Sequence, residues 1–347
     1  MRVPVSLAWG MPVLAVFTAG LLRRFHDETP TSPYMHPVIG NLLFAGVFVL
    51  LLVASRERIR GAVPGPGIRL GSLTPLLLML LIEKWISLGL YEPLFAFFSP
   101  DNLHPAFDDA FFRIAAGVGL LLTCLLLARL SAPTRRKTAR RLSFARLRLA
   151  LFQLVMIAGG TYLFIGVLAF LLGAPLQLRL PKGGALLGWV LIGQALIALG
   201  EEIYYRGLLY CEIERLAPRM RLKAAPARRW IAIGLTSMLF SMEHIQLDGG
   251  IGTIGRQLLF TASLGALFAL LAAISANLYL AAGVHMWINW LLLGAAPHFA
   301  DASGRPTLAA GSYIGITLAL SFIVAFAFRK RLPSAAPATL DKPPVHP

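Results

Sequence analysis

The sequence predicts an all-α fold, a polytopic transmembrane helical bundle with about eight to ten membrane helices. Of its 347 residues, 57% are hydrophobic and only 14% are charged, whereas soluble domains carry about 25% charged residues. The mean hydropathy is +0.71. Apolar runs of about 20 residues, long enough to cross a hydrocarbon core of about 30 Å as helices, recur along the whole chain.

The predicted membrane segments follow one another from the N-terminus to residue 328. They lie near residues 5–22, 37–55, 74–98, 110–131, 149–173, 184–210, 229–244, 256–275, 277–296 and 311–328. The segment 229–244 is short, and 277–296 follows its predecessor almost without a loop, so we expect one of them to be re-entrant or tilted. No small-residue cleavage site ends the first segment, which we interpret as an uncleaved helix.

The net charge of +16 is spread over alternate loops. Basic clusters follow the second, fourth, sixth and last segments, whereas the loop 99–112 is acidic. This positive-inside pattern predicts that both termini are cytoplasmic, and it argues against a nucleic-acid partner. Anionic lipid headgroups are the expected partners of the basic loops. The Ala-, Leu- and Arg-rich composition indicates a bacterial chain, and hence the inner (plasma) membrane.

The basic stretch after the fourth segment divides the chain. We predict N-terminal transmembrane helices in 1–131, a basic cytoplasmic loop in 132–148, a core carrying the chemistry in 149–328, and a basic then Pro/Ala-rich cytoplasmic tail in 329–347. The two cysteines, Cys124 and Cys211, suggest no disulfide framework.

Three charges stand at the end of the segment 184–210, in the sequence LGEEIYYRGLLY. A charge at the bilayer centre costs about 2.5–3.5 kcal/mol on insertion scales, so such residues usually pair or serve a function. Glu202 and Arg206 are four residues apart, share a helix face and are predicted to form a buried ion pair. Glu201 points elsewhere, and its neighbour one turn on is Tyr205, a hydrogen-bond donor rather than a counter-charge. Glu201 is therefore the candidate general base.

Two of the seven histidines lie in apolar segments. Phe240 precedes His244 by one helical turn, and Asn289 follows His285 four residues later on the same face. A lone histidine in a core helix more often packs than reacts. Polar groups from three separate spans, however, are strongly disfavoured in lipid unless they face one another or a water-filled cavity. We therefore expect these groups and Glu201 to gather in one polar site.

These residues resemble the three motifs of the CAAX-protease and bacteriocin-processing (CPBP or Abi) family. EEIYYR, FSMEH and HMWIN are similar, in that order, to Glu-Glu-x-x-x-Arg, Phe-x-x-x-His and His-x-x-x-Asn. The resemblance covers about residues 150–296 and implies an intramembrane glutamate protease like the type II CAAX prenyl endopeptidases, with no metal and no cofactor. The implied substrate is a membrane-associated protein or peptide.

The resemblance also implies a role for each motif residue. Glu201 and His244 would hold and activate a water molecule, and His285 and Asn289 would donate hydrogen bonds to the oxyanion. Three residues would support them from behind: Glu202 and Arg206 by fixing the helix and its local charge, and Phe240 by packing beside His244.

Two other functions stay open from the residues alone. Glu201, His244 and His285 are plausible ligands for a catalytic zinc, although the sequence holds no His-Glu-x-x-His helix. Intramembrane charges also mark transport paths, so a non-enzymatic transporter or bacteriocin-immunity protein is the third possibility. The motifs leave Glu243 and the pair Glu83–Lys84 unexplained, and we interpret that pair as a salt link between helices.

Overall fold

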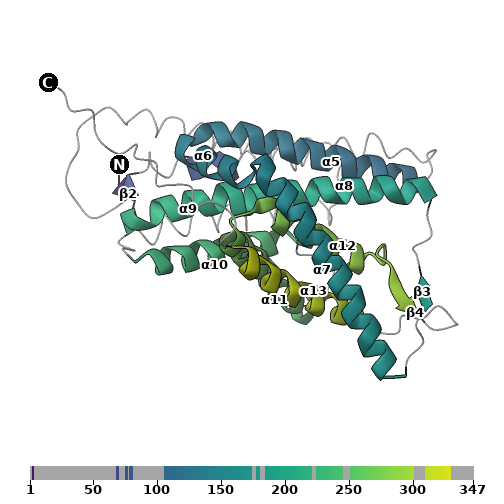
Figure 1. The fold of residues 1–347 in the computed structure, drawn as a ribbon. Helices are drawn as coiled ribbons and strands as arrows, with labels where there is room; N and C mark the ends of the chain where they lie inside the picture. Colours follow the sequence, from purple (N-terminus) through teal and green to yellow (C-terminus); the bar gives the residue numbers. More distant parts are fainter. Residues whose placement is uncertain are drawn as a thin grey trace.

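The computed structural model describes residues 2–3, 68–69, 75–76, 78–80, 105–173, 177–179, 184–220, 224–244, 251–300 and 309–329 (Figure 1). The predicted segments 5–22 and 37–55, the pair Glu83–Lys84, most of 74–98 and the tail beyond residue 329 lie outside these residues. Two short antiparallel sheets lie within the described residues. One pairs β1 (Arg2–Val3) with β2 (Ile68–Arg69), and the other pairs β3 (Gln177–Arg179) with β4 (His298–Ala300).

The rest of the described fold is helical. In chain order its elements are α5 (Pro105–Leu127), η3 (Ala128–Leu130), α6 (Ala132–Arg141), α7 (Phe144–Leu171), α8 (Gly184–Glu202), the π-helix η4 (Ile203–Leu209), α9 (Tyr210–Leu216), η5 (Ala217–Met220), α10 (Ala225–Glu243), α11 (Ile251–Ser275), α12 (Leu278–Leu292) and α13 (Ala310–Phe328). Five stretches of the described residues are long and apolar enough to cross a membrane: Phe111–Leu130, Phe144–Leu171, Leu187–Leu216, Gly252–Ser275 and Ala310–Phe328. The predicted all-α multi-pass membrane bundle is confirmed, whereas the total of eight to ten crossings stays a prediction.

Of the two segments that looked unusual in the sequence, 277–296 is short in the structure as well, whereas 229–244 belongs to the 19-residue helix α10. Helix α12 has 15 residues, about 22 Å of rise, which is less than a hydrocarbon core of about 30 Å. It follows α11 after only two residues, because Ala276 adopts a left-handed φ of 50° and turns the chain sharply. Asn277 then starts α12 by accepting a hydrogen bond from the Tyr279 amide at 3.1 Å.

Most of the basic stretch 132–148 is helical, so the predicted connection between membrane segments contains a helix of its own. Helix α6 fills its first ten residues, and α7 begins at Phe144. Pro133 stands in the first turn of α6, where a missing N–H costs nothing, and Ala, Arg and Lys are good helix formers. Thr134 and Thr138, one turn apart, form its buried face. The length of apolar runs predicts membrane helices, but it gives no signal for a short polar helix such as α6.

Helices α5 and α8 lie side by side along the bundle (Figure 1). Glycines allow this close approach: a Cβ on Gly193 would stand 2.6 Å from the Cβ of Arg113, and one on Gly200 would stand 2.7 Å from Leu120. Small residues at such crossings are how membrane helices gain packing without a hydrophobic driving force. Helix α5 thus supports the helix that ends in Glu201 and Glu202.

Candidate active site

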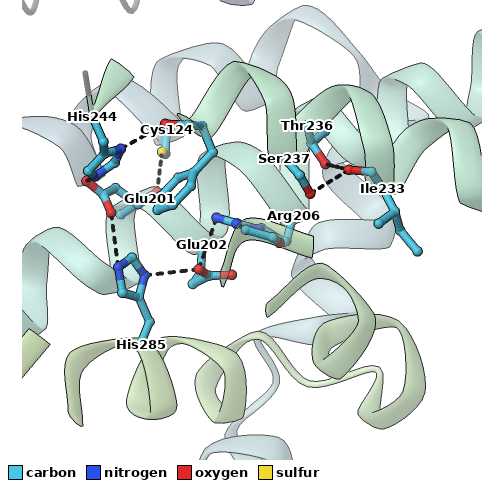
Figure 2. A network of polar contacts seen from close by, with 12 residues as sticks. Cys124, Glu201, Glu202, Arg206, Ile233, Thr236, Ser237, His244 and His285 are labelled. Carbon is cyan, nitrogen blue, oxygen red and sulfur yellow. Dashed lines mark hydrogen bonds and ion pairs between the residues drawn. The ribbon is translucent and has the colours of Figure 1, made fainter. Parts of the chain in front are cut away.

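The structure brings three of the predicted residues together from three elements (Figure 2). Glu201 lies in the last turn of α8, His244 directly after α10, and His285 in the middle of α12. Glu201 Oε1 lies 3.8 Å from His244 Nε2, and Glu201 Oε2 lies 3.6 Å from His285 Nε2. One carboxylate therefore stands between two imidazoles that are 41 residues apart in the chain.

A second carboxylate completes the cluster from behind. Glu202 Oε1 lies 3.1 Å from His285 Nδ1 and 3.1 Å from Nη1 of Arg206. The ion pair predicted from the four-residue spacing is thus present, and the histidine joins it. His285 connects the two adjacent glutamates, with one ring nitrogen on each.

Exposure falls steeply across this cluster. The His244 side chain is 37% exposed and that of Glu201 is 18% exposed, whereas His285 is 4% exposed and both Glu202 and Arg206 are fully buried. Within this described cluster, the Glu201–His244 side is therefore the more accessible one, and the buried pair lies behind it.

The hydrogen bonds determine which ring nitrogen carries a proton. His244 Nδ1 lies 2.8 Å from the backbone oxygen of Phe240, and because a carbonyl only accepts, that nitrogen must donate. Glu202, which pairs with Arg206, likewise accepts from His285 Nδ1. In both rings the remaining nitrogen, Nε2, faces Glu201. At 3.6 and 3.8 Å these contacts exceed hydrogen-bond length, so neither ring occupies the Glu201 oxygens directly.

Two phenylalanines hold the rings and the guanidinium in place. The Phe240 ring lies 4.3 Å from that of His244 and 5.7 Å from that of His285, and the Arg206 guanidinium carbon lies 4.5 Å above it. Phe268 of α11 stacks on His285 at 4.6 Å. Aromatic faces attract cations, so these rings are favourable neighbours for the buried guanidinium of Arg206. The expected packing role of Phe240 is present, and it extends to all three groups.

Arg206 relies on more than its ion pair. Its Nη2 donates to the backbone oxygen of Gly265 at 3.0 Å, whereas its Nε and Nη1 make no hydrogen bond within the described part of the chain. The contact with Glu202 is therefore a short ion pair whose N–H groups are poorly aimed. Such a charge is stable only with its partner in place, because an unpaired buried charge is costly.

Asn289 and Glu243 lie on α12 and α10, the helices that carry His285 and lead to His244. Asn289 is half-buried on α12, one turn after His285, and no hydrogen bond links its side chain to the cluster among the described residues. Glu243 is half-buried at the last position of α10, next to His244. His244 was expected inside an apolar helix, but it caps the C-terminus of α10, its amide bonded to the Ser241 oxygen at 3.0 Å.

Several residues of the site had no signal in the sequence. Phe268 and Gly265 belong to the apolar helix α11, and nothing in their local pattern distinguishes them from lipid-facing neighbours. Gln257, also on α11, donates to the His244 backbone oxygen at 2.7 Å. A polar residue at an apolar helix end is the one weak sign that was available for it. Within the described residues, no group of three or more His, Cys, Asp or Glu side chains is arranged to hold a metal ion.

The comparison with protein families matches the part of the chain that builds this cluster. Residues 183–291 match the family described as type II CAAX prenyl endopeptidase Rce1-like. The matched range begins just before α8 and ends within α12, so it contains Glu201, His244 and His285. Neither the curated proteins nor the solved structures gave a match to this chain.

Proposed function

We propose that this chain is an intramembrane endopeptidase in which Glu201 and His244 activate water, on the premise that residues 183–291 match the Rce1-like family of type II CAAX prenyl endopeptidases, a family of proteases. The observation that carries the proposal is the position of the Glu201 carboxylate, between two imidazoles and on the accessible side of a buried ion network. A protease of this family acts on a membrane-associated protein or peptide.

The reaction begins with a water molecule held by Glu201 and by Nε2 of His244. Glu201 takes a proton from this water as its oxygen attacks the scissile carbonyl carbon. When the tetrahedral intermediate collapses, the carbon–nitrogen bond breaks and the leaving amine receives that proton. A positioned base of this kind contributes about 10²–10⁴-fold to the rate. No covalent acyl-enzyme forms, because water is the nucleophile.

His285 and Asn289 stabilise the negative oxygen of that intermediate. Glu202 orients the His285 ring through Nδ1, so that Nε2 lies beside Glu201 and, when protonated, donates to the oxyanion. Asn289, one turn further along α12, offers the second donor. A lost oxyanion donor typically costs about 10²–10³-fold in kcat. The four residues thus divide between water activation and oxyanion binding.

The surroundings of the enzyme are also part of the proposal. The basic residues at the α6 end support a cytoplasmic position for that end, beside anionic lipid headgroups, and both termini on the same side. The composition favours a bacterial inner membrane, where peptides and protein C-termini other than prenylated CAAX sequences are the candidate substrates. Nucleic acid has no part in this function.

Glu201→Gln tests the function directly. The substitution keeps size and hydrogen bonding but removes the base, so cleavage of a membrane-peptide library by the detergent-solubilised protein should fall by at least about 10²-fold. Unfolding temperature and elution volume should stay unchanged, because Glu201 is not part of the buried pair. Glu243→Gln is the matched control, since it neutralises the neighbouring carboxylate, and it should retain activity.

The same assay decides between the proposal and its alternatives. Activity that survives in Glu201→Gln would place the base elsewhere. Activity lost on treatment with a strong chelator, and restored by zinc, would favour the zinc hydrolase. A wild-type protein that binds library peptides without cutting any would favour the transporter or immunity role.

A further inference from the structure

The π-helix η4 leaves one backbone oxygen of the site without its usual donor. In an α-helix the Tyr210 amide would donate to the Arg206 oxygen, four residues earlier. Here it donates to Tyr205, five residues earlier. Nη1 of Arg141, the last residue of α6, donates to the Arg206 oxygen at 3.1 Å instead. A side chain from another helix therefore donates the hydrogen bond that the π register removes from the Arg206 oxygen.

A second contact from α6 lies beside the first. The Thr138 hydroxyl donates to the Gly207 oxygen at 2.9 Å, and Thr138 itself is only 4% exposed. A Cβ on Gly207 would stand 2.8 Å from Cγ2 of Thr138, so the threonine lies directly against the backbone of η4. The glycine is what allows the two helices to approach this closely.

Helix α6 is also attached to the helix that follows η4. Glu212 and Glu214 both lie on α9. Thr134 donates to the buried carboxylate of Glu212 at 2.6 Å, and Lys137 pairs with Glu214. Helix α6 thus holds η4 and α9 as one unit. Residues 132–141 lie outside the range that matches the family, so these contacts come from a part of the chain that the motifs do not include.

The register of η4 determines where the buried pair stands. Glu202 precedes the π-helix and Arg206 lies inside it, and their contact reaches His285 through the same Glu202 oxygen. A π turn holds one residue more than an α turn. If it relaxed to an α-helix, the residues before it would rotate by about 100° relative to those after it. Glu201 and Glu202 would then turn away from the two histidines.

We propose that α6 is a positioning element for the active site, in which Thr138 and Arg141 hold η4 in the π register and thereby keep Glu202 and Arg206 behind His285. Neither side chain touches the reacting atoms. The kinetic consequence rests on the proposed peptidase function, whereas the anchoring of η4 is measurable without any substrate. Two independent measurements therefore test the proposal.

Backbone hydrogen exchange tests the anchoring. Thr138→Val keeps the shape of the side chain and removes its hydroxyl, and Arg141→Met removes the donor to Arg206. In each variant the amides of residues 203–211, followed by mass spectrometry, should exchange roughly fivefold faster, the factor that one hydrogen bond is worth. The controls are Thr138→Ser, which keeps the hydroxyl, and Arg140→Met, which removes an exposed charge next to Arg141. Both should exchange like the wild type.

Steady-state kinetics on a cleaved peptide test the consequence. Thr138→Val and Arg141→Met should lower kcat on the order of tenfold, because small displacements of catalytic groups are costly, while KM stays unchanged. Thr138→Ser should restore kcat. A purely structural role would instead lower the amount of folded protein and leave kcat per folded molecule intact.

Two results would overturn the proposal: exchange of residues 203–211 that is unchanged in both Thr138→Val and Arg141→Met, or a kcat that is equally unchanged in both. If the wild-type protein cleaves no peptide, the peptidase function fails and exchange alone decides. Faster exchange confined to those two variants would then still establish the anchoring of η4. Unchanged exchange would refute it.

Discussion

At the scale of single residues, the site combines two adjacent glutamates with opposite surroundings. Glu201 is partly exposed and faces two Nε2 atoms, while Glu202 is fully buried and is held by Arg206 and by His285 Nδ1. Neighbouring positions on a helix point about 100° apart, which explains how two identical side chains reach different environments. The partly exposed glutamate is the one proposed as the base, and the buried one is proposed as its support.

Glu202→Ala should destabilise the protein strongly. It leaves Arg206 buried without its partner, and breaking a buried pair from one side typically costs about 3–5 kcal/mol. A matched control is Glu214→Ala, whose partner Lys137 is 46% exposed, so that pair is worth only about 0–1 kcal/mol. Thermal unfolding in detergent measures both variants. Equal, small shifts for the two would show that the buried Arg206 does not depend on Glu202 for its stability.

At the scale of elements, glycines determine how closely the helices around the site approach one another. Gly193 and Gly200 of α8 face α5, and Gly283 of α12 lies against Leu154 of α7. These contacts position α8 and α12, the helices that bear Glu201 and His285. Because α8 and α12 are each packed tightly against a neighbouring helix, their side chains keep constant positions, as a positioned base requires.

Gly193→Ala should separate α5 from α8. Its Cβ would stand 2.6 Å from the Arg113 Cβ and 2.9 Å from the Arg113 carbonyl carbon, so backbone must move, at a cost of about 1–3 kcal/mol. Gly188→Ala in the same helix meets nothing within 4 Å and should be neutral or slightly stabilising. Thermal unfolding compares the pair. A Gly193→Ala protein as stable as Gly188→Ala would mean that α5 does not press on α8.

At the scale of the whole molecule, the two ends of the bundle differ in charge. Helix α6 and the start of α10 lie at the α9 end, where Lys137 and Arg229 both lie near Glu214, and the β3–β4 sheet lies at the opposite end (Figure 1). The exposed face of α6 carries Arg135, Arg136 and Arg140 as well. Such an imbalance is what orients membrane proteins, with the basic end in the cytoplasm.

Cysteine labelling should reveal this orientation. In right-side-out vesicles, a membrane-impermeant maleimide should label Leu178→Cys in β3 and spare Arg140→Cys in α6, and inverted vesicles should give the reverse. Both positions are exposed, whereas the native Cys124 and Cys211 are buried and should contribute little background. Labelling of both new cysteines from the same side would contradict the predicted topology.

The sequence by itself was sufficient to predict the membrane environment, the helical fold and the identity of the central residues. A backbone in lipid must satisfy its own hydrogen bonds, so long apolar runs have to become helices. Charged and polar groups in such runs are costly, so Glu201, Glu202, Arg206, His244 and His285 stood out against an apolar background. The four-residue spacing of Glu202 and Arg206 was likewise sufficient to predict their pairing.

Only the tertiary structure decided how those residues are held. The π register of η4, the stacking of Phe268 on His285 and the donors from Thr138 and Arg141 are contacts between elements far apart in the chain. Local patterns cannot contain them, because each partner alone is an ordinary member of its own helix. The polarity of the residues specified that a site exists, and packing between helices determined its geometry.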